Sequence, residues 1–324
     1  MFLFLVFLLC EINAISFKEW ISLHKKAFSP IEYLRRRAVF IENTKYVNEM
    51  NKQNLGFTLS NEGPFAVLTR EESVAITQGI HIDKSDLEQY KPLKREITEA
   101  IDYRNIQGKN YMTPVKDQGN CGSCYAFSSV ALMETAVLLS YDDLSPSNYS
   151  LSTAEIVSCC YDPSECRGCE GGSIGGALKY AQDNGMQSES SFPYKPFEQH
   201  CLQNQKVMRV KKYTHSDTKG DDEKVRSEIL SYGPVGSAMD ASRSSFLLYH
   251  GGIYNDKRCR SDKSTIAVVI VGYGIDKNNG KYFIVRNNWG PFWGEQGYFR
   301  ISSDNNLCGL SNDIYYIESI ERLK

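Results

Sequence analysis

Net charge of either sign and long apolar runs are both scarce in this sequence. The 37 Lys and Arg residues nearly balance the 39 Asp and Glu residues, which leaves a formal net charge of -2 over 324 residues. A chain this close to neutrality gives no indication of a nucleic acid or an anionic membrane surface as its partner. Beyond the N-terminus no segment is apolar for long enough to span a bilayer, so we expect a soluble product.

Sequence signals for bound metals and cofactors are also absent. The chain has five His and ten Cys residues, yet no group of them has the spacing of a metal site. No glycine-rich phosphate loop and no basic face typical of nucleic-acid binding occurs either. We therefore expect no metal and no cofactor. Ten cysteines are many for a cytosolic enzyme and indicate an oxidising compartment.

A short apolar run opens the chain. Residues Phe2 to Cys10 are too few to cross a membrane, and Ala14 supplies a small residue for cleavage. We interpret residues 1–14 as a secretory signal peptide, although no basic residue precedes the run; a buried strand is the alternative. The expected location is the secretory pathway, ending in a lysosome-like vesicle or outside the cell.

Residues 15–96 contain many charges and no cysteine. Six residues recur there at helical spacings of three and four: Glu32, Arg36, Phe40, Asn43, Val47 and Asn51. By itself this stripe predicts a solvated amphipathic helix with ion pairs between neighbouring turns.

The segment from Gln118 to Tyr125, QGNCGSCY, places two cysteines three apart directly before an apolar stretch with helical periodicity over 124–140. A cysteine at a helix N-terminus lies at the positive end of the helix dipole, which favours the thiolate. This segment resembles the active-site block of papain-like cysteine proteases, with Tyr125 where that family usually has Trp. The resemblance implies that Cys124 is the nucleophile and that Gln118 donates a hydrogen bond to the oxyanion. An idle buried thiol is the alternative for Cys124.

The resemblance extends over the rest of the chain. The stripe from Glu32 to Asn51 is similar to the Glu-Arg-Phe-Asn-Ile-Asn signature of papain-family propeptides, with Val47 in the isoleucine place. Residues 15–96 would then form a small helical inhibitory prodomain whose tail crosses the cleft in the reverse direction to substrate. Val67 stands where an aspartate is common, which puts pH sensing by that residue in doubt. Cleavage near Arg95 to Ile97 would release residues 97–324.

Residues 97–324 match a papain-like peptidase domain in length. The fold class implied is α+β, with a helical left lobe, a β-barrel-like right lobe and a cleft between them. Cysteine pairs also follow from the resemblance, because spacing alone does not fix connectivity. They are Cys121–Cys169, Cys159–Cys201, Cys259–Cys308 and, by likeness to cathepsin B, Cys160–Cys166. Under this pairing Cys124 is the unpaired thiol of the mature chain.

The catalytic histidine of the family is missing. The stretch STIAVVIVGYG, from Ser264 to Gly274, matches the family's Asn-His-Ala-Val strand, but Ile266 occupies the histidine position. The asparagine that orients the histidine is retained as Asn287, and Trp289 matches the tryptophan that shields this pair. Asn288 replaces the usual serine. By sequence position none of the five histidines is suited to replace the missing one.

Loss of the imidazole removes both the base that ionises the thiol and the acid that protonates the leaving amine. Losing general acid–base catalysis typically costs about 10²–10⁴-fold in rate. We therefore expect a papain-family endopeptidase precursor with lost or strongly reduced activity. The alternative is a pseudoprotease that binds peptides, or cystatin-like inhibitors of proteases, without cutting. The expected partners are peptide or protein substrates and the chain's own propeptide, and we expect a monomer.

Substrate-binding residues are also implied by the resemblance. Gly171 and Gly172 would pair with the main chain of an extended peptide; a simple glycine-rich turn is the alternative. The pocket for the second residue before the scissile bond would be lined by Ile174, Ala238 and Thr265, with Asp313 at its base. An acidic base favours arginine, whereas the alternative for Asp313 is a solvated loop carboxylate.

Overall fold

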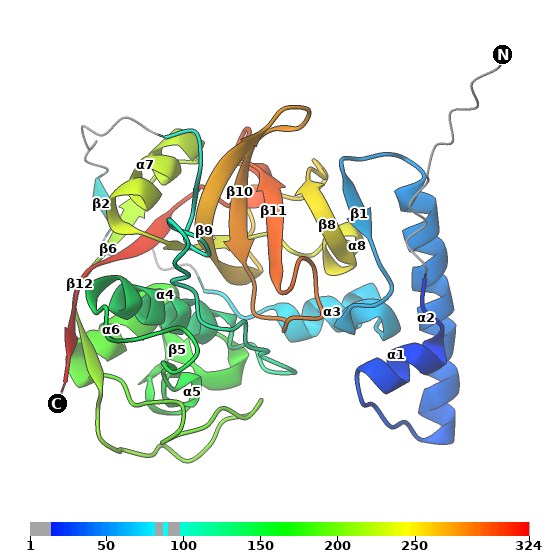
Figure 1. Ribbon diagram of the computed structural model, residues 1–324. Helices are drawn as coiled ribbons and strands as arrows, with labels where there is room; N and C mark the ends of the chain where they lie inside the picture. The colour runs from blue at the N-terminus through cyan, green and yellow to red at the C-terminus, as the bar shows by residue number, and fades with distance from the viewer. Residues whose placement is uncertain (1–13, 82–86, 90–97, 324) are drawn as a thin grey trace.

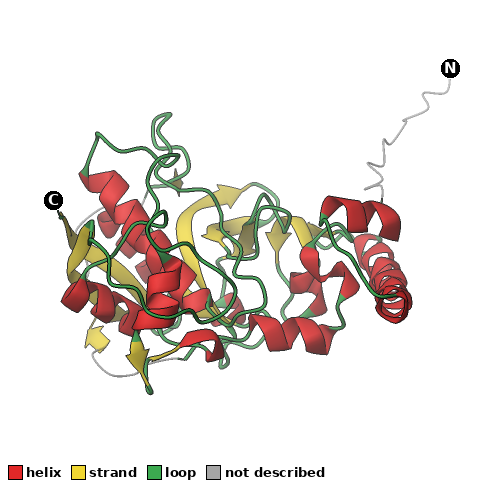
Figure 2. Cartoon of the chain, turned by 90° about the horizontal axis from the view of Figure 1, so that it is seen from below, coloured by secondary structure: helices red, strands yellow, loops and turns green. Residues whose placement is uncertain are grey.

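The computed structural model describes residues 14–81, 87–89 and 98–323 (Figure 1). Residues 1–13 of the expected signal peptide and the expected cleavage point at Arg95 to Ile97 lie outside the described residues. The chain has two parts, an N-terminal helical domain (residues 14–81) and a main domain (residues 98–323). In Figure 2 the strands of the main domain lie between the helices of the N-terminal domain at one end and further helices at the other.

The N-terminal helical domain is built on one long helix. Its elements are α1 (Phe17–Leu23), α2 (Pro30–Asn51), β1 (Phe57–Leu59), a 3-10 turn η1 (Pro64–Val67) and α3 (Arg70–Thr77). Each helix starts where the sequence offers a capping side chain. Ser16 and Thr69 form reciprocal capping boxes with Glu19 and Glu72, and Ser29 caps α2 ahead of a proline at its first turn.

The stripe on α2 faces the rest of this domain, so the solvated helix that periodicity alone favoured is wrong in its exposure, although the ion pair between neighbouring turns is present. Arg36 donates hydrogen bonds to Glu32, to Glu72 on α3 (2.6 Å) and to the carbonyl of Val67. Asn43 donates to the carbonyls of Ala66 and Leu68, and Asn51 donates to that of Leu59. Phe40 and Val47 are buried. The signature residues therefore fix the loops that follow α2.

Helices of the main domain gather in one lobe around α4 (Cys124–Ser140). Nearly every residue of α4 is buried, which explains its continuous apolar sequence. Beside it lie α5 (Thr153–Cys159), the hairpin β4 (Tyr161–Asp162) and β5 (Cys166–Arg167), a short turn η2 (Gly168–Glu170), and α6 (Ile174–Asn184). Three disulfides connect these segments, namely Cys121–Cys169, Cys159–Cys201 and Cys160–Cys166.

The second lobe consists of one long sheet and its covering elements. Its strands are β3 (Ile101–Asp102), β6 (Met208–Asp217), β7 (Val235–Met239), β8 (Tyr249–Tyr254), β9 (Ile266–Asp276), β10 (Gly280–Arg286), β11 (Tyr298–Ser302) and β12 (Ile314–Arg322). The helical elements are α7 (Asp222–Tyr232), α8 (Ser244–Leu247) and η3 (Leu307–Gly309). The fourth disulfide, Cys259–Cys308, closes this lobe. All four pairs are those expected from the sequence.

The order of strands is β1-β8-β11-β10-β9-β7-β12-β6-β2, with β3 also paired to β9. Both outer strands come from the N-terminal part of the chain. β1 pairs antiparallel with β8, and β2 (Leu87–Gln89) pairs parallel with β6. The central strand β9 is buried over most of its length, as its uninterrupted apolar sequence predicts. This α+β arrangement of two lobes after a small helical domain confirms the expected fold class.

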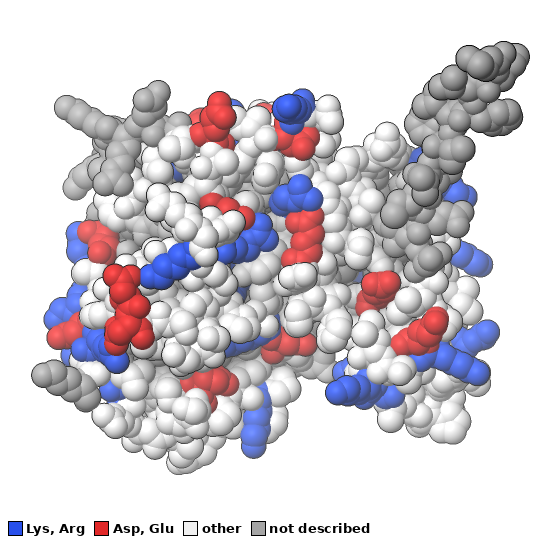
Figure 3. Space-filling model, viewed as in Figure 1, with Lys and Arg blue, Asp and Glu red and all other residues white. Residues whose placement is uncertain are grey.

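Charges of both signs are interspersed over the face of the molecule shown in Figure 3. Among the described residues no helix is long and apolar enough to cross a membrane. The same residues contain no group of three or more side chains suited to hold a metal ion.

One buried acid in this fold titrates far from its usual range. Glu228 on α7 is 2% exposed, and its Oε2 has no hydrogen-bond partner among the described residues. Burial, reinforced by the charge of Glu318 on β12, raises the pKa of Glu228 to about 7. The folded state therefore binds this proton more tightly than the unfolded chain does.

We predict that the free energy of unfolding falls as the pH rises from about 4.5 to about 7, because Glu228 must lose its proton while buried. Glu228→Gln should remove this slope, worth up to roughly 3 kcal/mol. Thermal unfolding followed by circular dichroism at pH 4.5 to 7.5 measures it, with Glu42→Gln on the exposed face of α2 as the control. An unchanged slope in Glu228→Gln would contradict the assignment.

Candidate active site

Cys124 is the first residue of α4 and is completely buried. The four disulfides leave it as the unpaired cysteine of the part of the chain that the structure describes. The N-terminus of α4 therefore presents a thiol to the junction of the two lobes, where β9 packs against α4. The sequence predicted both the start of this helix and the free thiol.

The surroundings of the Cys124 sulfur are apolar and uncharged. Burial raises the pKa of the thiol to about 11, opposed only in part by the backbone groups of Ala267, Tyr125 and Cys124 itself. Ala267 follows Ile266, the first residue of β9, whose side chain is also fully buried. The position where the family resemblance places a histidine thus adjoins the sulfur, and it carries isoleucine.

The five histidines lie at other places. His24 stacks on Trp20, His81 contacts Arg167, and His215 contacts Asp313. His200 precedes the disulfide-bonded Cys201, and His250 lies on β8. Among the described residues no imidazole interacts with Cys124. The expectation that no other histidine replaces the missing one therefore agrees with the geometry.

Gln118 is buried and held at both ends of its amide. Its Nε2 donates to the carbonyl of Cys121 (2.8 Å), and its Oε1 accepts from Nδ2 of Asn288 (2.9 Å). A second amide hydrogen on Nε2 is left for an oxyanion. Asn288 stands where the family usually has serine. Its contact with Gln118 was not predicted from the sequence, because the two residues are 170 positions apart.

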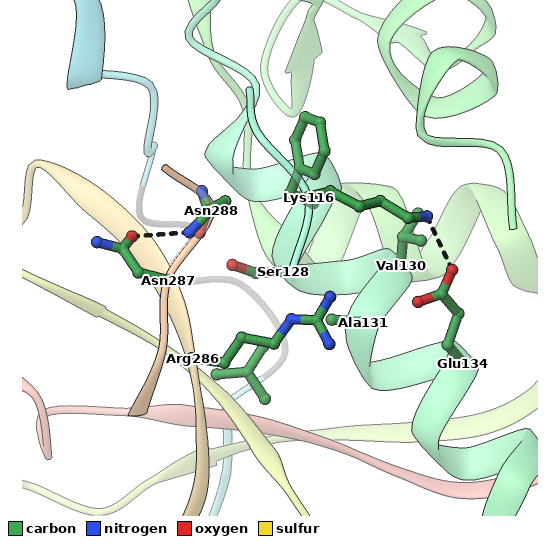
Figure 4. Close-up of a pocket in the computed structure, with 10 residues that line it drawn as sticks. Lys116, Ser128, Val130, Ala131, Glu134, Arg286, Asn287 and Asn288 are labelled. Atoms are coloured by element: carbon green, nitrogen blue, oxygen red, sulfur yellow. Dashed lines mark hydrogen bonds and ion pairs between the residues drawn. The ribbon is translucent and has the colours of Figure 1, made fainter. Parts of the chain in front are cut away.

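Asn287 has no imidazole to orient. Its Oδ1 accepts a hydrogen bond from the backbone N–H of Asn288 (2.9 Å), and its buried Nδ2 has no partner among the described residues. In Figure 4 this nitrogen points away from Ser128 and from the small cavity beside it. Trp289 is buried next to it, with Phe65 of the N-terminal domain packed edge-on at 4.7 Å.

An ion-pair network under α4 connects the two lobes (Figure 4). Lys116 donates to Glu134 on α4 (2.9 Å), and Thr113 donates to the same carboxylate. Arg286, at the end of β10, donates to the carbonyl of Thr113 (2.7 Å). Burial disfavours the charge on Glu134, but Lys116 and Arg286 together hold its pKa below the usual range. This network therefore links α4 to the end of β10 through the segment from Thr113 to Lys116.

The cleft next to Cys124 is occupied by residues 79–81 of the N-terminal domain. The N–H of Gly172 donates to the carbonyl of Gly79 (3.0 Å), and the N–H of His81 donates to the carbonyl of Gly172 (2.8 Å). The bridge between Ile80 and Gly172 is parallel. On the other wall, Gly79 donates to the carbonyl of Thr265 (3.3 Å). Gly172 thus pairs with an extended chain, which a simple turn would not do.

Gly79 and Gly171 allow this close approach. A Cβ on Gly79 would lie 2.2 Å from the carbonyl oxygen of Gly122, which no side chain tolerates. Gly171 has φ +119°, and a Cβ there would lie 2.9 Å from the carbonyl oxygen of Gly79. Two backbones therefore meet in the cleft without side chains between them.

The four residues expected to line the pocket lie close together. Ala238 on β7 pairs with Ala267, and Gly236 on the same strand approaches the side chain of Ile174. Thr265 accepts a hydrogen bond from the N–H of Ala241 through its Oγ1. Asp313 is 18% exposed and lies 2.5 Å from Nε2 of His215. The alternative of a solvated carboxylate is therefore wrong for Asp313. The contact between His215 and Asp313 was not predicted from the sequence.

His24 joins the two domains. Its ring stacks on Trp20 (4.3 Å) and packs edge-on against Phe292 of the main domain (5.5 Å), and its Nε2 lies 2.7 Å from the carbonyl oxygen of Glu62. Burial lowers the pKa of His24, with a smaller contribution from Lys26; the Glu62 carbonyl and the Asp117 carboxylate oppose it.

We predict that Gly79→Ala expels residues 79–81 from the cleft and exposes Cys124, because the new methyl group overlaps the Gly122 carbonyl. The rate of Cys124 alkylation by iodoacetamide in the full-length chain should rise at least tenfold, which corresponds to about 1.4 kcal/mol. Gly63→Ala is the matched control, since its Cβ would meet no atom closer than 3.8 Å. Equal alkylation of both variants would show that residues 79–81 do not protect the thiol.

We predict that acid loosens the contact between the two domains through His24. Because burial in the folded precursor lowers the pKa of His24, its contribution is complete above the ordinary value near 6.5 and is lost as the pH falls. His24→Gln should flatten this response, whereas His200→Gln, on the exposed surface, should leave it unchanged. Small-angle X-ray scattering from pH 7.5 to 4.5 measures detachment as a larger radius of gyration. The same pH midpoint in wild type and His24→Gln would exclude this role.

Comparisons with known proteins agree with this geometry. Residues 97–318 match the model of the papain family cysteine protease, and residues 17–73 match the cathepsin propeptide inhibitor domain (I29). Cysteine proteinase 3 of Entamoeba histolytica is 39% identical over 311 residues, covering 94% of each chain, and procathepsin L of Rattus norvegicus is 33% identical over 309 residues, covering 92% of this chain and 90% of the relative. The structure of digestive procathepsin L 3 from the larval midgut of Tenebrio molitor superposes with a TM-score of 0.83 at 29% identity, covering 93% of this chain and 97% of the other. This chain therefore belongs to the papain family of cysteine proteases and carries the propeptide inhibitor domain of that family.

Proposed function

We propose that this cysteine protease precursor yields a papain-fold domain that still binds extended peptides in its cleft but hydrolyses them at a strongly reduced rate. One observation carries the proposal. The Cys124 thiol lies against the backbone of Ala267, with isoleucine at position 266 and no imidazole among its interactions. Peptide hydrolysis by a thiol needs a base to ionise the sulfur and an acid to protonate the leaving nitrogen.

The thiol of the precursor is almost entirely protonated. With a pKa of about 11, about one thiol in 10⁴ is ionised at pH 7. Removal of residues 79–81 lifts part of the burial but brings no positive charge to the sulfur. The dipole of α4 contributes about 0.3–1 kcal/mol at a typical helix terminus, which is less than one pKa unit.

The leaving group is the second obstacle. An amide nitrogen must be protonated as its bond to carbon breaks, and no acid lies at this position among the described residues. Gln118 retains an amide hydrogen for the oxyanion, so an activated ester could still acylate Cys124. The chemistry left to this site is therefore slow thiol acylation rather than efficient peptide cleavage.

Peptide binding does not depend on the missing imidazole. The N–H and C=O of Gly172 and the C=O of Thr265 pair with residues 79–81 in the precursor and become available when these residues leave. An extended peptide satisfies the same groups by strand addition. Peptide or protein substrates, and cystatin-like inhibitors that recognise this fold, are the proposed partners of the processed domain.

Maturation follows from the same proposal. Residues 1–14 would be removed as a signal peptide in the secretory pathway, and residues 15–96 would be removed as a propeptide by cleavage near Arg95 to Ile97. The released domain, residues 97–324, would act as a monomer in a lysosome-like vesicle or outside the cell. The similarity to procathepsin L of Rattus norvegicus and to cysteine proteinase 3 of Entamoeba histolytica supports this route.

A second candidate is an ordinary active endopeptidase. The presence of Cys124, Gln118 and Asn287 favours it, because the fold alone does not explain why the chain has all three of these family active-site residues. The two candidates differ in turnover and agree in peptide binding, so the rate of cleavage separates them.

We predict that Ile266→His raises kcat/KM for a fluorogenic dipeptide amide by at least 10²-fold, because it restores the acid–base group next to Cys124. The buried Asn287 amide can orient the new imidazole. Its oxygen would give up the hydrogen bond from the backbone N–H of Asn288 and accept one from the imidazole N–H instead. Titration with an epoxide inhibitor directed at the thiol counts reactive sites in each preparation. A cystatin-like inhibitor measures cleft binding independently of turnover.

Ile266→Ala is the matched control, since it opens the same space without an imidazole and should stay at the wild-type rate. Wild-type protein that cleaves the amide with kcat/KM above about 10⁴ M⁻¹s⁻¹, a normal enzyme value, would reject the proposal. Failure of Ile266→His to gain any activity would reject Ile266 as the cause of the loss.

A further inference from the structure

A buried histidine contacts the carboxylate of Asp313, the residue expected at the base of the substrate pocket. Nε2 of His215 on β6 lies 2.5 Å from Oδ2 of Asp313, in the loop before β12. The side chain of His215 is 4% exposed, and that of Asp313 is 18% exposed. The two residues are 98 positions apart in the chain, so the pairing of β6 with β12 brings them together.

The ring of His215 is fixed by its other neighbours. It stacks on Tyr315 of β12 with centroids 3.9 Å apart and planes within 12°. Beyond the Tyr315 ring lies Gly175 of α6, whose Cβ would come within 3.2 Å of Tyr315. Gly175, His215 and Tyr315 all line a groove of about 760 Å³ between α6, β6 and the β4–β5 hairpin. His215 therefore forms a wall between this groove and Asp313.

The other charged groups near His215 already have partners. The groove carries Asp162, Glu165, Lys179 and Asp183. Asp162 accepts from Ser164, Glu165 accepts from Ser173, and Lys179 pairs with Asp183. On β6 itself, Asp217 accepts from the N–H of Lys219, and on β12 Glu318 accepts from Thr214. In the part of the chain that the structure describes, Asp313 is thus the charged group in direct contact with His215.

Strand pairing connects the pair to the backbone that contacts Cys124. Asp313 precedes Ile314, which pairs with Ser237 on β7. The next residue of β7, Ala238, pairs with Ala267, whose backbone contacts the Cys124 sulfur. In the pocket that the family resemblance implies, a peptide side chain between Ala238 and Ile174 would face Asp313 at the base, with His215 in contact with its carboxylate.

We propose that His215 determines the specificity of this pocket, by sharing the Asp313 carboxylate so that the pocket selects arginine only when the imidazole is uncharged. The inference rests on the proposed peptide-binding function. With a neutral imidazole the pair carries one negative charge, which favours a guanidinium. With a protonated imidazole the pair is neutral, so the pocket no longer binds arginine more tightly than an apolar side chain such as leucine.

This inference changes the substrate class expected from the sequence. Asp313 alone predicted arginine at every pH at which the carboxylate is ionised. Imidazoles in proteins ordinarily change charge between pH 5 and 8. In an acidic compartment the domain would therefore accept peptides with an apolar residue at this position, and near neutrality it would favour arginine.

The test uses the processed domain and two fluorescently labelled, end-blocked tetrapeptides that differ only in arginine or leucine at the second residue before the scissile bond. Neither side chain titrates between pH 5.5 and 8, so any change in their relative affinity belongs to the protein. Fluorescence anisotropy gives both Kd values at each pH. For wild-type protein the preference for arginine over leucine should increase on the order of tenfold between pH 5.5 and 8.

Variants assign the effect to the pair. His215→Gln keeps a donor to Asp313 without a charge, so the arginine preference should be high at both pH values. Asp313→Asn should lower the preference at both pH values, and it provides an independent readout if His215→Gln does not fold. His200→Gln, an exposed histidine in the same domain, should behave as wild type.

The outcomes separate the inference from the function on which it rests. A wild-type preference that stays constant with pH overturns the role of His215 while leaving peptide binding intact. Persistence of the pH response in His215→Gln would also overturn the role of His215 while leaving peptide binding intact. Absence of binding by both peptides at every pH would overturn the proposed function together with this inference.

Discussion

The contact between the first turn of α4 and the first residues of β9 determines what this protein does. It joins the two lobes and places the buried Cys124 thiol against the backbone of Ala267, which follows the buried Ile266. The network of Glu134, Lys116 and Arg286 also links α4 to β10. In a papain-type enzyme the same contact holds a thiolate–imidazolium pair. Here the contact is apolar, because the position next to Ala267 carries the buried Ile266.

Main-chain hydrogen bonds dominate the rest of the cleft. Gly172 and Thr265 hold residues 79–81 through N–H and C=O groups, which any extended chain provides. None of these contacts involves the side chain at position 266. They come from a glycine-rich backbone that the Cys121–Cys169 bridge holds in place.

Much of the fold and part of the site could be predicted from the sequence. The QGNCGSCY block, the strand from Ser264 to Gly274 and the cysteine pattern fix the lobes and the position of Ile266, because each is a continuous motif with an internal register. Periodicity alone favoured a solvated face for the stripe on α2, because it shows that one face differs but not what covers it, whereas the propeptide signature placed the stripe in a helical prodomain. His215 and the Asn288–Gln118 contact were missed for a related reason. Their partners lie 98 and 170 residues away, and only strand pairing brings them together.

The two outermost strands of the long sheet have a consequence for the mature protein. Both β1 and β2 precede the main domain in sequence, so a single maturation event would uncover β8 at one end and β6 at the other. Bare strand edges invite pairing between molecules, and native proteins defend them with charge or irregular backbone. β8 is bent at Gly252, where φ is +91° and where Phe57 of β1 pairs with it. On β6, β2 covers His215 to Asp217, and the exposed Lys211 and Lys212 precede that stretch. If the N-terminal part were shed, the bend in β8 would therefore hinder pairing between molecules at that edge.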